Sequence, residues 1–305
     1  MVSTCTRIRS MFRRPDTTNT LFYSSLSSAI SCSITTSSVS YIRTCRIYCR
    51  VFSEFSFDKN MAHTALGTDK MNANWETDIG GMRIKYKDKS ETFTEDDLKS
   101  KEPFGQFKAW FDEATKTPGV LEPNAMCLAT ATRDGIPSAR FVLLKGFGPD
   151  GFKFYTNYES RKGQELAENP QAALTFYWEP MRRSVRIEGR VEKTSSADGD
   201  EYFRARPFHS QLGALASKQS AIIAGRETLM IKERELLAQH TEGQVARPEC
   251  WGGYRVIPRS IEFWQGQSDR LHDRIRFRRR EPKDKPDGIL IHEGTDGWVY
   301  ERLSP

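Results

Sequence analysis

The sequence predicts a mainly β protein, an antiparallel barrel with helices packed around it. Two Asp-Gly pairs, Asp134-Gly135 and Asp150-Gly151, separate short apolar segments in the way that hairpin turns separate neighbouring strands. Strand-like segments dominate, and they do not alternate with helices as a doubly wound parallel sheet requires. No phosphate-binding P-loop or dinucleotide-binding glycine pattern occurs, so nucleotide-triphosphate enzymes and dinucleotide folds are disfavoured.

The first predicted element is a helix over 104–115, because apolar side chains recur there at helical spacing and mark a core-facing stripe: Phe104, Phe107, Trp110, Phe111 and Ala114. Strands are predicted at 125–133, 138–144, 152–157, 172–178 and 183–193. A helix over 160–168, ended by Asn169-Pro170, interrupts them. Helices follow at about 197–206, 211–217 and 226–239, and then strands at 253–257, 260–265, 273–279, 289–293 and 297–302.

Residues 1–60 differ in composition from the rest of the chain. They hold seven Arg and one Lys against three acidic residues, hence +5 of the formal net charge of +6, together with 13 Ser and 8 Thr. An Arg-rich, Ser-rich, acid-poor start is typical of an organelle transit peptide, and the alternative is a dispensable extension bypassed by starting at Met61. We therefore expect a leader over 1–60, a linker over 61–81 and a folded domain over 82–305. The expected location is the cytoplasm or, through the leader, mitochondria.

Charge, hydropathy and cysteine content exclude several classes of protein. The 245 residues after the leader carry a net charge of +1, which leaves no domain-wide basic surface for nucleic acid. The mean hydropathy is −0.62, and no apolar run approaches the length of about 18 residues that a membrane span needs. Outside the leader only Cys127 and Cys250 remain, too few for a disulfide framework or a cysteine zinc site, so no metal is expected.

A first group of basic residues suits a phosphate. Arg161 and Lys162 lie in the first turn of the predicted helix over 160–168, with Ser160 as its expected N-cap. The helix dipole disfavours cations at that end unless an anion is bound, and the free N–H groups there favour an anion. The alternative interpretation is a solvated basic pair beside Glu159.

A second basic group is Tyr202, Arg206 and Ser210, spaced by four residues each. Tyr202 and Arg206 are expected on one face of a helix that Pro207 ends, and Ser210 is expected to cap the next helix. A phenol, a guanidinium and a hydroxyl are suitable donors to a phosphate dianion. Because this spacing is common on ordinary helix surfaces, the motif on its own is weak evidence for a phosphate site.

A third group lies around a strand break in the segment 264–274, with Trp264, Arg270, His272 and Arg274. If this segment is extended, residues 270, 272 and 274 face one side of it. A lone histidine is more often structural than catalytic. Of the five histidines in the sequence, however, His272 is the one flanked by arginines in this way. No Ser-His-Asp order and no paired-histidine motif occurs, so the polar residues indicate a cofactor that brings its own reactivity.

Longer motifs occur in order along the chain: Asn124-Ala-Met-Cys-Leu-Ala-Thr, Ser138-Ala-Arg-Phe-Val-Leu-Leu-Lys145-Gly, Phe154-Tyr-Thr-Asn-Tyr-Glu-Ser-Arg161-Lys162-Gly, Arg206-Pro with Ser210-Gln211, Ser217-Lys-Gln219-Ser220, Trp251-Gly-Gly-Tyr, the segment 264–274, and Glu301-Arg-Leu-Ser-Pro. Through these motifs the chain resembles the pyridoxine 5'-phosphate oxidase family from about residue 82 to residue 305.

The resemblance implies an FMN-binding split barrel, an obligate homodimer and two FMN molecules at the subunit interface. The implied reaction oxidises pyridoxine 5'-phosphate or pyridoxamine 5'-phosphate to pyridoxal 5'-phosphate by hydride transfer to FMN, which O2 reoxidises with release of H2O2. The implied FMN contacts are Arg140, Phe141, Val142, Leu143, Tyr155, Thr156, Arg161, Lys162, Gln219, Ser220, Trp264 and Arg274. The implied substrate-phosphate contacts are Lys145, Tyr202, Arg206 and Ser210. Arg270 and His272 match the catalytic contacts to the pyridine ring, and Arg83 and Tyr86 match a segment that closes over the substrate.

Two positions depart from the family pattern. Ser184 stands where the family usually has Gln, and a serine hydroxyl reaches less far toward the flavin ring edge than an amide does, so we expect weaker FMN binding or a shifted flavin potential. Asp269 places an acidic residue beside Arg270, where a neutral one is usual. A rival interpretation, another split-barrel flavoprotein such as a flavin reductase or FMN carrier, would need Arg140 and Arg161 but not the second and third groups.

Overall fold

The computed structural model of the chain describes residues 79–82, 86 and 91–305. The predicted leader, most of the predicted linker and Arg83 lie outside the described residues. The described residues belong to one compact unit that spans Asp78–Pro305.

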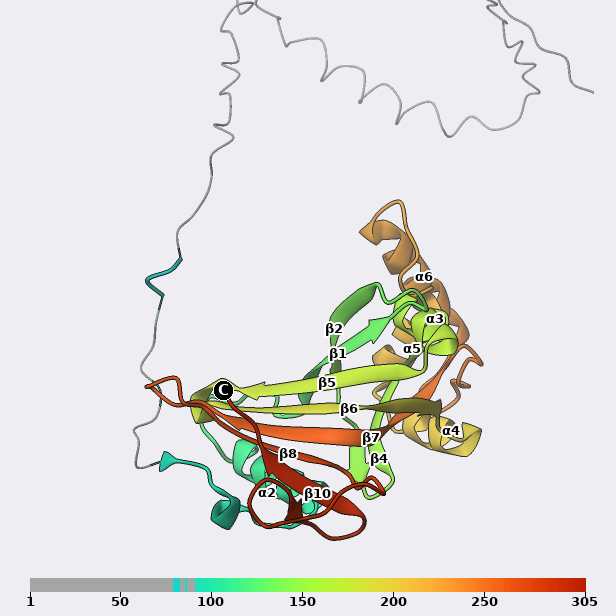
Figure 1. Cartoon of the computed structure of the whole chain (residues 1–305). Coiled ribbons are helices and arrows are strands. Elements are labelled where there is room, and N and C mark those ends of the chain that lie inside the picture. The colour runs from blue at the N-terminus through green and yellow to red at the C-terminus, as the bar shows by residue number, and fades with distance from the viewer. Residues whose placement is uncertain (1–78, 83–85, 87–90) are drawn as a thin grey trace, which may run out of the picture. The chain divides into compact units, whose positions relative to one another are not determined.

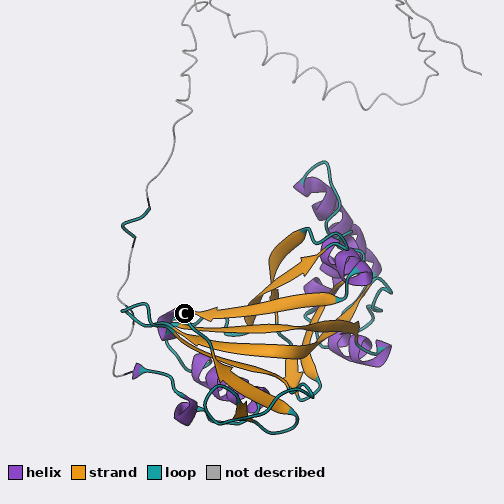
Figure 2. Cartoon of the chain, viewed as in Figure 1, coloured by secondary structure: helices purple, strands orange, loops and turns teal. Residues whose placement is uncertain are grey.

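An antiparallel sheet forms the centre of this unit (Figures 1 and 2). Its main path runs in the order β2-β1-β5-β6-β7-β8-β10-β9, and the hairpin of β3 and β4 joins it through pairing of β4 with β7. The strands are β1 (Ala125–Ala131), β2 (Pro137–Leu143), β3 (Gly146–Gly148), β4 (Gly151–Asn157), β5 (Gln171–Trp178), β6 (Arg183–Lys193), β7 (Trp251–Gln265), β8 (Asp273–Arg279), β9 (His292–Glu293) and β10 (Trp298–Arg302). The predicted antiparallel β class is confirmed. Asp134-Gly135 lies in the connection between β1 and β2, and Asp150 lies in the turn between β3 and β4, with Gly151 as the first residue of β4.

Strand β7 corrects the prediction of two strands at 253–257 and 260–265, because it is continuous over 15 residues. A register shift at Glu188/Gly189 on β6 sets Gly189 opposite Pro258 and Glu188 opposite Ser260. The bulge accommodates Pro258, which has no N–H to donate, so the strand continues past it. The first half of β7 pairs with β4 and its second half pairs with β8, while β6 pairs with most of the length of β7.

The predicted strand at 289–293 is also wrong in extent, since only His292–Glu293 pairs in the sheet. The Asp287 carboxylate accepts hydrogen bonds from the backbone N–H groups of Ile289, Leu290 and Ile291. These bonds hold a turn there instead of an extended strand, because side-chain acceptors compete with strand pairing for the backbone donors.

Helices cover the sheet at separate places (Figure 1). They are α2 (Pro103–Ala114), α3 (Arg161–Glu168), α4 (Ser196–Arg204), α5 (Phe208–Ala216) and α6 (Arg226–Gln239), with short 3-10 turns η2 (Glu95–Asp97) and η3 (Glu179–Met181). Helix α2 begins at Pro103 with Glu102 as its N-cap, whose carboxylate accepts from the N–H groups of Phe104 and Gly105. No helix in the described part of the chain is long and apolar enough to cross a bilayer.

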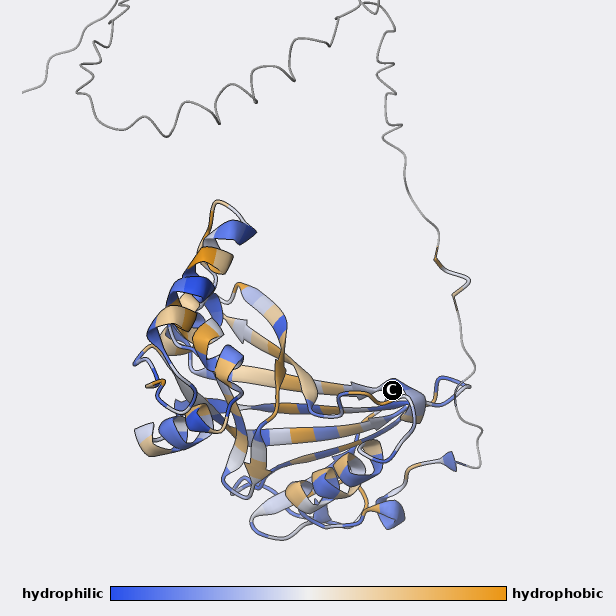
Figure 3. Ribbon diagram, turned by 180° about the vertical axis from the view of Figure 1, so that it is seen from behind, coloured by the Kyte–Doolittle hydropathy of each residue, from blue (hydrophilic) through white to orange (hydrophobic). Residues whose placement is uncertain are grey.

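The predicted aromatic stripe of α2 packs into the main core. Phe107 is fully buried, and its ring lies 4.8–5.7 Å from those of Phe111, Phe147, Phe152 and Phe176. Figure 3 shows hydrophobic and hydrophilic residues alternating along several strands, as expected where one face of a sheet meets the core. A second, smaller core lies among α4, α5, α6 and the start of β7: Phe203, Leu212, Leu236, Val245 and Trp251.

Candidate functional site

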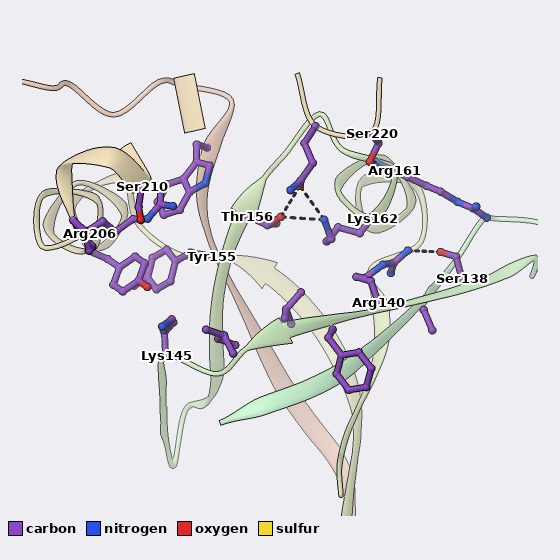
Figure 4. A pocket seen from close by; sticks show the side chains of 18 of the residues that line it. Ser138, Arg140, Lys145, Tyr155, Thr156, Arg161, Lys162, Arg206, Ser210 and Ser220 are labelled. Atoms are coloured by element: carbon purple, nitrogen blue, oxygen red, sulfur yellow. Dashed lines mark hydrogen bonds between the residues drawn. The ribbon is translucent and has the colours of Figure 1, made fainter. Parts of the chain in front are cut away.

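The first two groups of basic residues predicted from the sequence line one cavity of about 950 Å³ (Figure 4). Its walls are the strands β2 and β4, the first turn of α3, the junction of α4 and α5, and the loop after α5. The predicted site residues that line it are Arg140, Phe141, Val142, Leu143, Lys145, Tyr155, Thr156, Arg161, Lys162, Tyr202, Arg206, Ser210, Gln219 and Ser220.

The start of α3 has the predicted geometry. Ser160 is the N-cap, and its hydroxyl accepts from the backbone N–H of Gly163. Lys162 is 7 % exposed, and its ammonium donates to Gln219 Oε1 (2.9 Å), Thr156 Oγ1 (3.2 Å) and Ser160 Oγ (3.3 Å). Lys162 is therefore not the solvated cation of the alternative interpretation.

Within the described part of the chain, Lys162 contacts hydroxyl and amide acceptors but no carboxylate. Burial, followed by the positive charge of Arg140, lowers the pKa of Lys162 from 10.5 to about 8, and the attraction of Glu165 offsets part of this shift. An anion placed beside a buried cation stabilises the charged form that burial disfavours. This end of the cavity therefore suits a phosphate.

The second group lies at the other end of the cavity, on a backbone that differs from the prediction. Helix α4 ends at Arg204, so Arg206 follows the helix and does not share a helical face with Tyr202. Pro207 is the N-cap of α5, and Ser210 lies inside its first turn instead of capping it. Pro207 explains both corrections, because it disfavours helical conformation in the preceding residue and suits the start of the next helix.

Arg206 carries the clearest sign of a ligand. Its guanidinium lies 4.6 Å from the ring of Trp251, and among the described residues its Nη1 is a buried nitrogen with no hydrogen-bond partner. Burial lowers the pKa of Arg206. Unpaired buried donors are rare in folded proteins, so an acceptor is expected at this position.

Aromatic rings connect the two ends of the cavity. The rings of Tyr155 and Tyr202 are stacked at 4.0 Å, and Trp251 is stacked on Tyr155 at 5.8 Å. Lys145 lies over the outer part of this stack, with Nζ 5.9 Å from the Tyr202 ring. Trp251 was not singled out as a site residue from the sequence, and its position in the Trp251-Gly-Gly-Tyr motif was the available signal.

The remaining predicted flavin contacts line a different cavity, of about 520 Å³, on the strands β5 to β8. Ser184, Trp264 and Arg274 belong to it. Ser184 donates its hydroxyl proton to the backbone carbonyl of Phe176 (2.8 Å), and Arg274 donates to Glu262 (2.7 Å). Within one chain, the described residues thus divide the predicted flavin contacts between two cavities.

The segment 264–274 is not one extended stretch, because residues 266–272 connect two strands. Strand β7 ends at Gln265, β8 begins at Asp273, and Arg270 has a left-handed backbone with φ of 67°. The strand break expected in this segment is confirmed, whereas the one-sided arrangement of residues 270, 272 and 274, which needed an extended segment, does not occur. Arg270 and His272 line neither of the two cavities.

His272 nevertheless has a defined environment. Its Nδ1 accepts from the backbone N–H of Gln267 (3.0 Å), and its ring lies 4.9 Å from Trp264 and 6.2 Å from Tyr86. Burial and then the charge of Arg270 lower the pKa of His272. A neutral imidazole that accepts at Nδ1 carries its proton on Nε2, which leaves that nitrogen as a donor.

No cluster of three or more potential metal ligands of the His, Cys, Asp or Glu type occurs among the residues with described positions. The donors of the large cavity are cations, hydroxyls and amides, which suit phosphate oxygens and not a metal ion.

Comparisons with known proteins agree with these observations. A family model described as pyridoxamine 5'-phosphate oxidase matches residues 111–240, and one described as the pyridoxine 5'-phosphate oxidase C-terminal dimerisation region matches residues 251–305. The chain is 59% identical over 234 residues to a pyridoxine/pyridoxamine 5'-phosphate oxidase of Bombyx mori, covering 76% of this chain and 91% of the relative. It is 54% identical over 229 residues to pyridoxine-5'-phosphate oxidase of Bos taurus, covering 75% and 88%.

Solved structures show the same fold. PhzG from Burkholderia lata 383, solved in complex with tetrahydrophenazine-1-carboxylic acid, matches with a TM-score of 0.59 and 31% identity over 70% of this chain and 97% of its own. An FMN-binding protein of Nostoc punctiforme related to pyridoxamine 5'-phosphate oxidase matches with a TM-score of 0.50 and 13% identity over 67% and 98%. The split-barrel expectation is confirmed, and this chain belongs to the pyridoxine/pyridoxamine 5'-phosphate oxidase family.

Proposed function

We propose that this chain oxidises pyridoxine 5'-phosphate and pyridoxamine 5'-phosphate to pyridoxal 5'-phosphate with FMN as cofactor. The alcohol and O2 give the aldehyde and H2O2, and the amine with O2 and water gives the aldehyde, ammonia and H2O2. The observation that carries the proposal is a single cavity with two separate ends, each lined by cations and hydroxyls that suit a phosphate. A flavin carrier or flavin reductase needs one such end, for the cofactor, whereas an oxidase of a phosphorylated substrate needs both.

The cofactor phosphate is assigned to the end formed by the start of α3. Lys162, Arg161 and the hydroxyl of Ser220 surround it, and Ser220 already accepts from the backbone N–H of Arg161 (3.2 Å). The buried, partly discharged Lys162 supports this assignment, because the charge of a phosphate stabilises its protonated form. When bound, FMN supplies the redox chemistry by accepting two electrons from the substrate and passing them to O2.

The substrate phosphate is assigned to the end formed by Lys145, Tyr202, Arg206 and Ser210. The unpaired Arg206 Nη1 supports this assignment, since a phosphate oxygen would provide its missing acceptor. The guanidinium is held against Trp251, so it loses little freedom when a phosphate binds. Anchoring one end of the substrate in this way orients its ring for reaction.

Arg270 and His272 are assigned to the pyridine ring of the substrate. The described geometry supports a role for the Nε2–H of His272 as a donor, because its Nδ1 is already used. Tyr86 lies beside His272 and Trp264, which supports its assignment to a segment that covers the substrate. Arg83 is assigned to the same segment by the family resemblance alone.

We also propose that the protein acts as a homodimer in which each FMN is held by both subunits. The match of residues 251–305 to a dimerisation region supports the dimer. The division of the flavin contacts between two cavities of one chain supports a shared site, with Arg140 and Arg161 from one subunit and Ser184, Trp264 and Arg274 from the other.

The test is to purify the full chain, record its visible spectrum, and add pyridoxine 5'-phosphate in air while following the aldehyde and H2O2. A yellow protein that forms both in equal amounts supports the proposed oxidase. A yellow protein that forms neither would identify a flavin carrier, and a protein that stays inactive and does not bind added FMN would contradict the cofactor assignment.

The cytoplasm is the proposed location, and mitochondrial import through residues 1–60 is the alternative. Imaging of the full chain fused to a fluorescent protein distinguishes them, with deletion of residues 1–60 as the control. Import that depends on these residues would contradict the cytoplasmic assignment.

A further inference from the structure

Glu165 is a buried acidic residue beside the cation-rich end of the large cavity. It lies on α3, is 4 % exposed, and is not among the residues that line the cavity. An anion this close to a phosphate site would weaken phosphate binding by repulsion unless it has another role. The reaction described above gives it none.

The contacts of Glu165 reach two other elements. Its Oε1 accepts from Arg161 Nε (2.9 Å) on its own helix. Its Oε2 accepts from Thr130 Oγ1 (2.5 Å) on β1 and from Ser138 Oγ (2.6 Å) on β2, and Arg140 Nη2 lies 3.4 Å away. Both carboxylate oxygens are therefore engaged.

The hydroxyls of Thr130 and Ser138 connect Glu165 to Arg140. Each hydroxyl has one proton, and both protons are donated to Glu165. Their lone pairs are then free to accept from Arg140, whose Nη1 donates to Thr130 (2.5 Å) and whose Nη2 donates to Ser138 (2.5 Å). Figure 4 shows Arg140 bonded to Ser138 in this way.

Glu165 stays ionised across the working pH range. Burial alone would raise its pKa, but the hydrogen bonds from Ser138, Thr130 and Arg161 and the charge of Arg140 lower its pKa to about 2. A permanently charged carboxylate does not act as a proton donor near neutral pH. It is suited to holding cations in a fixed geometry.

We propose that Glu165 is a positioning residue that holds the guanidinium groups of Arg140 and Arg161 in place for the phosphate of the flavin. This inference rests on the proposed cofactor. With Lys162 protonated, Arg140, Arg161 and Lys162 together with Glu165 leave a local charge of +2, which matches the dianion of a phosphate monoester at neutral pH. Held guanidinium groups bind an anion with less loss of side-chain freedom than mobile ones.

Glu165→Gln tests the inference, because it removes the charge with little change of shape. The dissociation constants of FMN and of riboflavin, which lacks the phosphate, are measured on the flavin-free full chain by quenching of flavin fluorescence. We expect the FMN dissociation constant to rise about tenfold or more, as for loss of a charge-assisted contact, while that of riboflavin changes less than about twofold. Glu168→Gln, an exposed acid on the same helix, is the matched control and leaves both constants unchanged.

Other outcomes overturn the inference in distinct ways. Tighter FMN binding by Glu165→Gln would mean that the carboxylate acts as a competing charge, and an equal loss of FMN and riboflavin would mean that it only supports the fold. If Glu165→Gln does not fold, Glu165→Asp is the second variant, because its shorter side chain keeps the negative charge but moves it away from Arg161. An FMN dissociation constant equal to the parent's in Glu165→Asp overturns the inference. Failure of the parent chain to bind FMN at all would instead contradict the proposed function.

Discussion

Under the proposed function, Lys162 should make FMN binding dependent on pH. Its pKa lies at about 8 instead of 10.5, because burial and then the charge of Arg140 disfavour its protonated form. At about 1.4 kcal/mol for each pH unit, the charged form costs about 3 kcal/mol more in the flavin-free protein than in water. This destabilisation is fully present below pH 8, and it disappears as the pH rises from 8 towards 10.5, so the flavin-free protein gains stability in that window.

A bound phosphate dianion needs the protonated form of Lys162, so the affinity for FMN should fall above pH 8. The dissociation constant is expected to rise about tenfold between pH 7 and pH 9, because the charged fraction of Lys162 falls by about that factor. The phosphate itself stays a dianion in this range, since its second pKa is about 6.

Fluorescence titration of the flavin-free chain with FMN at pH 7, 8 and 9 measures this dependence. Lys162→Met should weaken binding at pH 7 and remove the dependence on pH, whereas Lys108→Met, at an exposed lysine paired with Asp112, should behave like the parent. The reasoning is refuted if the parent binds FMN equally at pH 7 and pH 9, or if Lys162→Met keeps the parent's pH dependence.

Further predictions concern the substrate clamp, the flavin edge, the ring contact and the core. Arg206→Lys should raise the KM for pyridoxine 5'-phosphate about tenfold or more, because a point charge replaces a bidentate donor; an equal change in FMN affinity would contradict this. Ser184→Gln should lower the FMN dissociation constant, measured by fluorescence titration, because an amide reaches further toward the flavin ring edge than a serine hydroxyl does. A dissociation constant equal to the parent's would show that Ser184 does not weaken FMN binding. Arg270→Ala should reduce kcat more than FMN affinity, and equal losses would count against a role at the substrate. Phe107→Ala should lower the free energy of unfolding by about 3–5 kcal/mol in urea titrations of the flavin-free protein, and a loss below about 1 kcal/mol would show that the core adapts.

The antiparallel fold could be predicted because its signals are local. The Asp-Gly turns and the spacing of Phe107 and its neighbours on α2 each lie within a short stretch of chain. The continuity of β7 could not be predicted this way, because a proline normally interrupts a strand. Pro258 is tolerated because β7 bulges directly after it, with Arg259 as the extra residue between Pro258 and Ser260.

The site was predictable in its residue types and less so in its geometry. A capped helix start with two cations was enough to indicate the end of the cavity at Lys162, which we propose for the flavin phosphate. Glu165 was missed, since a glutamate on a short helix normally faces solvent, and its burial depends on how β1 and β2 pack on α3. The position of Arg206 depends on where α4 ends, which Pro207 shifts by two residues from the predicted end at 206.

The length of β7 has a consequence for how the protein behaves on dilution. Gly252, paired with Thr156, and Trp264, paired with Ser184, stand 12 residues apart on this strand, which corresponds to about 40 Å at about 3.3 Å per residue. A flavin mononucleotide does not span that distance, so under the proposed dimer the two ends of one strand serve different cofactor molecules. Cofactor affinity and subunit association are then thermodynamically linked: dilution into monomers releases FMN, and added FMN drives reassembly.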